Sequence, residues 1–337
     1  MMYLSPSMHR SSMMIHRNAQ RSRRMMNSCI QQRFVFRSST DNRSRRASTT
    51  TYYDSQSGQH VTIHDESKIT AYLRNVDRTV TTTTGAAALS SSAKEMGMAG
   101  SVISLPQQLQ LQQDGGMVGF MESLGSNSSS IFLHILPSQY YDLVVTKEKH
   151  HHRNNDTIIP SNINLCFEYN NDNGEHISSN VQSAMTNFDG IQTSIGIFHP
   201  KYLLDDDPML VAAQVANLID TTFEFGGTIS NILVAPIMIM DDNDDTTTLT
   251  SYDDELVQLC EELSYLDVPG STIKSRLVVP TVSGDQLEEC LQMGITKYII
   301  DASDDDDGTG RESVEGRLNV LRDAVEENGK ELILDIV

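Results

Sequence analysis

Strand-like and helix-like segments alternate regularly from residue 191 to the end of this 337-residue sequence. After each apolar run comes a segment whose apolar residues recur at helical spacing. A crossover that contains a helix is long enough to return the next strand parallel to the last, so the alternation predicts an α/β fold. The expected strands are 191–198, 229–240, 276–282, 296–301 and 331–337, and the expected helices between them are 208–225, 252–266, 285–293 and 313–327.

The helix at 208–225 carries the clearest end signals. Asp207 precedes Pro208, and this pair is typical of an N-cap followed by the first helical turn. Gly226 and Gly227 follow the last apolar position and predict the helix end. The next run, 229–240, is almost unbroken in its apolar character, as expected for a parallel strand buried on both faces.

Order is expected to begin near Ile131. Short strands are predicted at 131–136, 142–146 and 163–169. With the five later strands they would give eight. Because no helical pattern separates them, they are expected to join the sheet as an antiparallel or mixed addition, and the α/β domain is predicted to span 131–337.

The segment 39–130 is poor in periodic apolar pattern and rich in Ser, Thr, Gln and Gly. Such a composition buries too little apolar surface to offset about 1–2 kcal/mol of backbone entropy per residue. We interpret it as a low-complexity, mostly disordered linker, so that a disordered N-terminal third precedes the β/α units.

The first 50 residues hold ten Arg, no Lys and the single acid Asp41, on a chain whose formal net charge is −20. A leader that is rich in Arg and Ser and poor in acids is typical of an organelle transit peptide. The segment Arg33 to Ser38 resembles a mitochondrial cleavage site, so we interpret residues 1–38 as a transit peptide and expect the mitochondrial matrix. A basic disordered tail that binds an acidic partner or nucleic acid is the alternative.

The acidic body argues against a nucleic-acid or anionic-lipid binder, and no apolar run approaches the roughly 18 residues of a membrane span. The four Cys are scattered without a CxxC, which predicts neither a disulfide framework nor a zinc site. The triplet His150 to His152 and the acidic runs 241–245 and 301–307 are interpreted as solvated loops, because their spacing fits no metal motif. GxGxxG, P-loop, GxSxG and HExxH motifs are absent.

Several segments resemble hydroxymethylglutaryl-CoA lyase, a member of the pyruvate carboxyltransferase-like metallolyases, which are TIM barrels. The segments 277–284, 298–303 and 313–318 are similar to the third and fourth βα units of that family. The segments 197–201 and 216–220 are similar to its first strand and helix. The resemblance extends over 195–337 and implies β/α units that form part of a TIM barrel.

The family's chemical motifs are missing. Its first strand ends in Arg-Asp, where this chain has Lys201 and Tyr202, and its second strand carries a Glu that 231–236 lacks. Its His-x-His metal ligands would belong to a seventh strand, beyond Val337. Three explanations remain open: a truncated product, a noncatalytic relative, or a different α/β fold completed by the early strands, and we favour a complete but irregular α/β domain.

The candidate catalytic residues are His199, Lys201 and Asp301, which lie at the carboxyl ends of predicted strands, where α/β proteins place ligands. The resemblance implies an acyl-CoA lyase or aldolase that cleaves or forms a carbon–carbon bond on an acyl-CoA or small oxo-acid, with a divalent cation such as Mg²⁺ or Mn²⁺. The alternative is a noncatalytic binding or assembly protein. Clustering of the three residues favours an enzyme, and dispersal favours a binding module.

Overall fold

The computed structural model describes a large part of the chain between residues 50 and 334, and it separates into two units, Met1–Ser44 and Arg45–Val337. Only the second unit is described below. The predicted transit peptide, the His150 to His152 triplet and the acidic runs 241–245 and 304–307 lie outside the described residues. Those residues are 50–54, 59–63, 65–75, 83–104, 120–121, 124, 129–141, 143–144, 160–170, 174–188, 190–236, 253–268, 271–282, 284–302 and 310–334.

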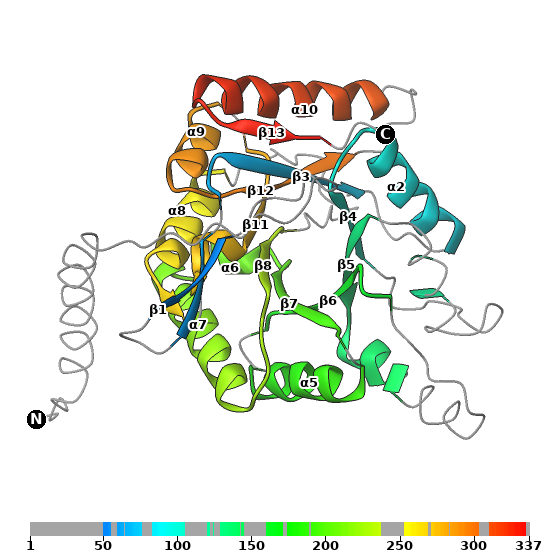
Figure 1. Cartoon of the computed structure of the whole chain (residues 1–337), viewed down its shortest axis with the longest axis vertical. Coiled ribbons are helices and arrows are strands. Elements are labelled where there is room, and N and C mark those ends of the chain that lie inside the picture. The colour runs from blue at the N-terminus through cyan, green and yellow to red at the C-terminus, as the bar shows by residue number, and fades with distance from the viewer. Residues whose placement is uncertain are drawn as a thin grey trace, which may run out of the picture. The chain divides into compact units, whose positions relative to one another are not determined.

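Eight parallel strands close into a TIM barrel (Figure 1). The last strand pairs with the first through a register that runs from Lys297 opposite Thr70 to Ala302 opposite Asn75, and this pairing completes the ring. The expectation of an α/β protein built from TIM-barrel-like units is therefore confirmed. In order around the barrel the strands are β3 (Lys68–Asn75), β4 (Gly100–Ser104), β5 (Ser130–Ile135), β6 (Ile163–Glu168), β7 (Gln192–Ile197), β8 (Asn231–Val234), β11 (Leu277–Pro280) and β12 (Lys297–Ala302).

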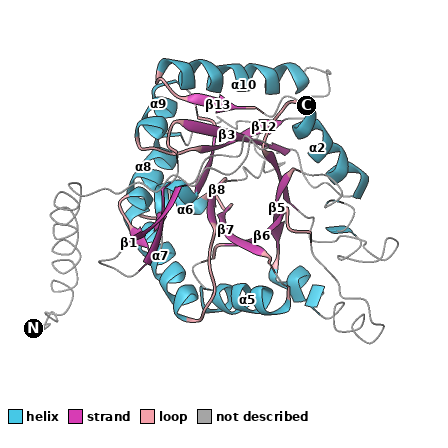
Figure 2. Cartoon of the chain, in the orientation of Figure 1, coloured by secondary structure: helices cyan, strands magenta, loops and turns pink. Residues whose placement is uncertain are grey.

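Helices surround the strands (Figure 2). They are α2 (Thr83–Glu95), α5 (Gly174–Asn187), the short α6 (Lys201–Leu204), α7 (Pro208–Glu224), α8 (Asp253–Ser264), α9 (Gly284–Gln292) and α10 (Gly310–Glu327). The smaller elements are the antiparallel pair β1 (Thr50–Asp54) and β2 (Gln59–Ile63), the antiparallel pair β9 (Asp267–Val268) and β10 (Ser271–Thr272), the 3₁₀ turn η3 (Ile273–Arg276) and β13 (Glu331–Ile333).

The end signals of α7 act as predicted. The carboxylate of Asp207 accepts a hydrogen bond from the backbone N–H of Met209 at 3.0 Å, and Pro208 begins the first turn. Gly226 has a φ of 80°, the left-handed conformation that ends a helix at no cost for a residue without Cβ. Local chemistry therefore sets both limits of this helix.

The structure differs from the linker interpretation over residues 68–75 and 83–104, which contain β3, α2 and β4. These elements lack a strong apolar pattern for a physical reason. β3 turns Thr70 and Arg74 into the barrel, and α2 buries small or polar residues such as Ala86 and Ser90 against the strands. Burial here depends on small side chains and on a paired Arg, which apolar periodicity does not detect.

The predicted addition of early strands also needs correction. β5 and β6 pair in parallel with their neighbours, and the described residues Leu143 and Val144, predicted as strand, are helical. The last predicted strand is observed as β13, but it pairs with Lys68–Thr70 of β3, and the barrel closes without it. The eight barrel strands therefore begin at β3 and end at β12.

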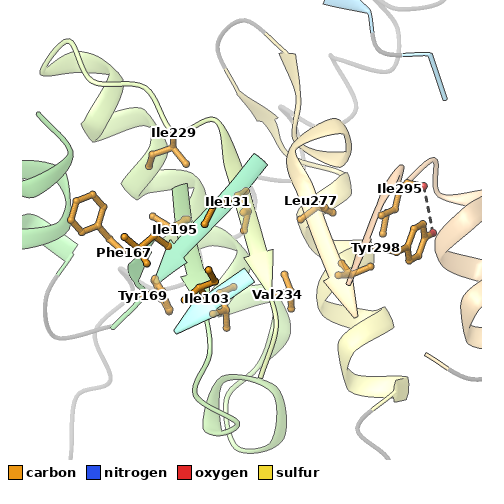
Figure 3. Packing of buried hydrophobic residues seen from close by; sticks show 14 of the residues in the cluster. Ile103, Ile131, Phe167, Tyr169, Ile195, Ile229, Val234, Leu277, Ile295 and Tyr298 are labelled. Carbon is orange, nitrogen blue, oxygen red and sulfur yellow. Dashed lines mark hydrogen bonds between the residues drawn. The ribbon is translucent and has the colours of Figure 1, made fainter. Parts of the chain in front are cut away.

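The apolar core has an outer and an inner part. Outward side chains of the strands pack against the helices, as Figure 3 shows for Ile103, Ile131, Phe167 and Ile195. In the same view the Tyr298 hydroxyl donates to the carbonyl of Ile295 at 3.4 Å. Inward side chains form a separate cluster inside the barrel, made of Tyr72, Val102, Phe132, Cys166, Phe198, Leu233, Ala235, Val278 and Ile299.

This inner cluster blocks the middle of the barrel and leaves polar residues at its two ends. Side chains alternate in and out along each strand, so every second residue continues the inner face above and below the cluster. The carboxyl end carries Arg74, Ser104, His134, Glu168 and Asp301, and the amino end carries Asn164, Ser194, Asn231 and Lys297. The two ends are therefore separate polar environments.

Candidate active site

The polar residues at the carboxyl end come from five different strands. Catalytic residues of TIM barrels gather at this end, because each strand there opens into a loop while the barrel holds the strand ends in place. Ser104 ends β4, and Arg74 and His134 lie one residue before the ends of β3 and β5. Glu168 ends β6, and Asp301 lies near the end of β12. The contacts among them form two groups.

The first group is a two-pronged ion pair. Arg74 Nε donates to Asp301 Oδ1 at 2.6 Å, and Arg74 Nη2 donates to Asp301 Oδ2 at 2.8 Å. Arg74 Nη1 also donates to the carbonyl of Ala235 at 2.7 Å, and only 2% of Arg74 is exposed. Such a fork fixes both partners in one geometry. Asp301, a predicted catalytic residue, is thus the counter-ion of a buried Arg.

The second group joins Ser104, His134 and Glu168. Ser104 Oγ lies 3.3 Å from His134 Nδ1, and Glu168 Oε2 lies 3.6 Å from His134 Nε2. The second distance is too long for a hydrogen bond, and the buried Nε2 has no hydrogen-bond partner among the described residues. If Ser104 donates to Nδ1, the ring proton is on Nε2 and lies beside the carboxylate.

Phe198 holds the His134 ring from one side. The two ring centroids are 4.1 Å apart with an interplanar angle of 36°. Gly196 provides the space for this arrangement, because a Cβ at this position would lie 2.1 Å from the Phe198 ring. Apolar packing therefore fixes the plane of an imidazole whose two nitrogens have polar neighbours.

Glu168 is the electrostatic centre of the second group. Its contact with His134 is the largest cause that lowers the pKa of Glu168 below its ordinary 4.5, against the opposing effect of partial burial. The charges of His199 and Lys201 lower this pKa further. Glu168 is therefore ionised at neutral pH, and 31% of its side chain is exposed to a molecule that approaches the strand ends.

The structure brings two of the three predicted residues together. His199 and Lys201 follow β7 at the start of α6, where the backbone N–H of Lys201 donates to His199 Nδ1 at 3.2 Å. The ammonium of Lys201 lies 4.8 Å from the centre of the Tyr202 ring. Both residues act on Glu168, whereas Asp301 contacts Arg74 and accepts at its carbonyl from Arg317 Nη1 at 2.9 Å.

The strand numbering implied by the metallolyase resemblance was wrong. The segment 197–201, compared with a first strand, follows β7, which is the fifth strand of the barrel. The segments 277–284 and 298–303 belong to the seventh and eighth strands, not the third and fourth. No group of three or more His, Cys, Asp or Glu within the described ranges is arranged to hold a metal ion.

Four residues of the carboxyl end were not among the predicted candidates: Arg74, Ser104, His134 and Glu168. Arg74 and Ser104 lie in the segment interpreted as linker, which removed them from consideration. His134 and Glu168 lie in predicted strands, at positions that share the inner face with Phe132 and Cys166. Strand periodicity applied to both strands would have indicated them.

No helix in the part of the chain that the structure describes is long and apolar enough to cross a membrane. No protein-family model matches the chain, and no curated protein matches it. Solved structures similar to it include phospho-2-dehydro-3-deoxyheptonate aldolase from Thermotoga maritima, which is 10% identical with a TM-score of 0.44, over 81% of this chain and 73% of that one.

Two further solved structures have the same kind of similarity. Orotidine 5′-monophosphate decarboxylase from Methanocaldococcus jannaschii is 10% identical with a TM-score of 0.39, over 74% of this chain and 98% of that one. A putative fructose-1,6-bisphosphate aldolase from Coccidioides immitis is 11% identical with a TM-score of 0.36, over 78% and 90%. At these values the barrel assignment rests on the strand pairing of this chain itself.

Proposed function

We propose that this chain is an enzyme that transfers a proton at the carbon beside a carbonyl group, removing it to form an enolate before a condensation and returning it to the enolate that a carbon–carbon cleavage releases. One observation carries the proposal: His134 Nε2, a buried ring nitrogen without a hydrogen-bond partner among the described residues, lies 3.6 Å from Glu168 at the carboxyl end of the barrel. A carboxylate base next to an imidazole donor is an arrangement that forms enolates without a metal ion.

Each residue has a distinct role in this proposal. Glu168, ionised because its pKa is lowered, accepts the proton from the α-carbon. The N–H of His134 Nε2 donates to the carbonyl oxygen and stabilises the negative charge that develops there. Ser104 at Nδ1 and the Phe198 ring hold the imidazole in that orientation. The proton then returns from Glu168 to the enolate or to the product.

The charges around Glu168 favour an anionic substrate. His199 lies just before α6 and Lys201 is its first residue, and the charges of both lower the pKa of the Glu168 carboxyl group. A small oxo-acid has a carboxylate that these groups could bind and a carbonyl for His134. An acyl-CoA offers a thioester carbonyl and phosphates, and it remains the second substrate class to test.

The test is hydrogen exchange at the α-carbon. The full chain is incubated in D₂O with a panel of 2-oxo acids and acetyl-CoA, and proton NMR follows the loss of the α-proton signal. We expect exchange above the buffer rate for at least one compound, with or without EDTA. Replacing Glu168 by Gln should slow exchange by about 10²–10⁴-fold.

Two comparisons make this test specific. Glu288→Gln, a matched change at an exposed position of α9, should leave the exchange rate unchanged. His134→Gln should slow exchange, because the amide cannot take the ring's place between Ser104 and Glu168. Exchange at the buffer rate with every compound, from a chain that unfolds cooperatively, would reject the proposal and favour a noncatalytic binding protein.

We also propose that residues 1–38 direct the chain to the mitochondrial matrix, because they hold seven Arg and no acidic residue. A fluorescent protein fused to residues 1–38 should enter mitochondria. The same fusion with Arg33 and Arg37 replaced by Gln should retain the leader after import, and a cytosolic signal from the unchanged fusion would reject the proposal.

A further inference from the structure

The amino end of the barrel interior carries a second polar group, far along the strands from the carboxyl-end site. In an eight-stranded barrel, inward residues of alternate strands stack in layers. The observed registers place Gly100, Asn164, Asn231 and Lys297 in one such layer, on β4, β6, β8 and β12. Ser194 on β7 is the register partner of Asn231.

Lys297 reaches across the interior toward β8. Its Nζ donates to Asn231 Oδ1 at 2.6 Å and to the carbonyl of Ser275 at 3.1 Å. An ammonium has three N–H groups, so these two bonds leave one donor. The ammonium is therefore held beside Asn231 on β8. The neighbouring strand β7 carries Ser194, and the strand after it, β6, carries Asn164.

Three polar atoms on this arc have no hydrogen-bond partner among the described residues. They are Asn164 Oδ1, Asn164 Nδ2 and Ser194 Oγ. Asn164 is 2% exposed and Ser194 is not exposed at all. A buried polar atom without a partner is costly, and native proteins contain few of them. Strands β6 and β7 thus carry a buried amide and a buried hydroxyl beside β8, whose Asn231 binds the Lys297 ammonium.

Positive charge accumulates at the same end. Burial, together with the charge of Arg276, lowers the pKa of Lys297 from 10.5 to about 8. The value stays above neutral pH, so the ammonium form predominates in solution at pH 7. Arg276 is itself partly buried, which lowers its pKa, and its Nη1 donates to the carbonyl of Ile229 at 3.1 Å. The two oxygens that bind the Lys297 ammonium, Asn231 Oδ1 and the Ser275 carbonyl, are neutral and do not compensate its charge.

We propose that this end of the barrel interior binds a small monovalent anion of the size of chloride, held by the Lys297 ammonium, the Asn164 side-chain N–H and the Ser194 hydroxyl. Asn164 and Ser194 lie on the neighbouring strands β6 and β7, and the Lys297 ammonium reaches from β12 to Asn231 on β8, next to β7. The anion would satisfy these three donors and neutralise the buried charge together. A single water molecule would satisfy the hydrogen bonds but would leave the charge uncompensated. The test below separates the two occupants.

Thermal unfolding of the full chain is measured while sodium gluconate is replaced by sodium chloride at constant ionic strength, so that screening does not change. Saturating chloride should raise the midpoint by roughly 2–8 °C, because it binds the folded state alone. Lys297→Met and Ser194→Ala should lose most of this rise. Lys274→Met, which removes a lysine ion-paired with Glu66 on the surface, should keep it.

A direct measurement accompanies the unfolding series. The chloride-35 NMR line should broaden with the unchanged chain and with Lys274→Met, and it should narrow toward the buffer value with Ser194→Ala. Ser194→Ala removes one hydroxyl, so it decides the matter if Lys297→Met does not fold. If chloride changes the unfolding midpoint and the chloride-35 line width equally in every variant, or in none, the anion proposal is overturned and water is the occupant.

Discussion

Arg74 and Asp301 lie opposite each other in the register that joins β3 to β12, the first and last strands of the barrel. Their two-pronged ion pair therefore lies across the contact that closes the ring. The third donor of Arg74 reaches the carbonyl after β8 and links a further strand to this contact. We interpret the pair as a structural link between the first and last strands of the barrel, next to the candidate active site.

Breaking this pair on one side should destabilise the fold. Arg74→Met leaves the Asp301 carboxylate partly buried without its counter-ion, and we expect a loss of about 3–5 kcal/mol in the free energy of unfolding. Urea denaturation measures the loss. The double variant with Asp301→Asn should lose less stability than the sum of the losses of the two single variants. The control is the more exposed ion pair of Lys274 with Glu66, where Lys274→Met should cost about 1 kcal/mol or less. Additive losses would contradict the coupling.

Filling the space at Gly196 should displace Phe198 from His134. The added Cβ of Gly196→Ala would lie 2.1 Å from the Phe198 ring, so the ring must move. We expect a loss of about 1–3 kcal/mol in the free energy of unfolding and slower α-proton exchange. Gly316→Ala is the matched control, because nothing lies within 4 Å of its added Cβ in α10, and it should stabilise the chain by about 0.5–1 kcal/mol.

The lowered pKa of Glu168 should set the acid limit of exchange. A base whose pKa lies below its ordinary 4.5 stays ionised until the pH falls below that value. The acid limb of the exchange rate should therefore lie below pH 4.5 in the free enzyme, and His134→Gln should move it upward, because the largest cause of the shift is removed. A limb that stays in place in this variant would contradict the role given to His134.

Lys297 should make stability rise with pH in chloride-free buffer. Its pKa is lowered from 10.5 to about 8 in the folded chain, so between these values the unfolded chain binds more protons. The free energy of unfolding should then increase with pH over this window, by at most about 1.4 kcal/mol per pH unit. Lys297→Met should remove this rise, while Lys274→Met should preserve it.

The sequence determined those elements whose signals are local. The limits of α7 follow from Asp207, Pro208 and Gly226, and β8 and β11 follow from continuous apolar runs. These signals identify an α/β fold with parallel strands because a helical crossover and a doubly buried strand each leave a pattern within one segment. They do not say which strand of a barrel each segment forms.

Tertiary structure decided the closure and the site. β3 and α2 were missed because Arg74 is buried only with Asp301 as its partner, and because α2 packs through small residues such as Ala86 and Ser90. His134 and Glu168 lie on separate strands and meet only when neighbouring strand ends are brought together by the barrel. Burial of a charge and contact between distant residues both depend on the closed ring, so no single segment of the sequence records them.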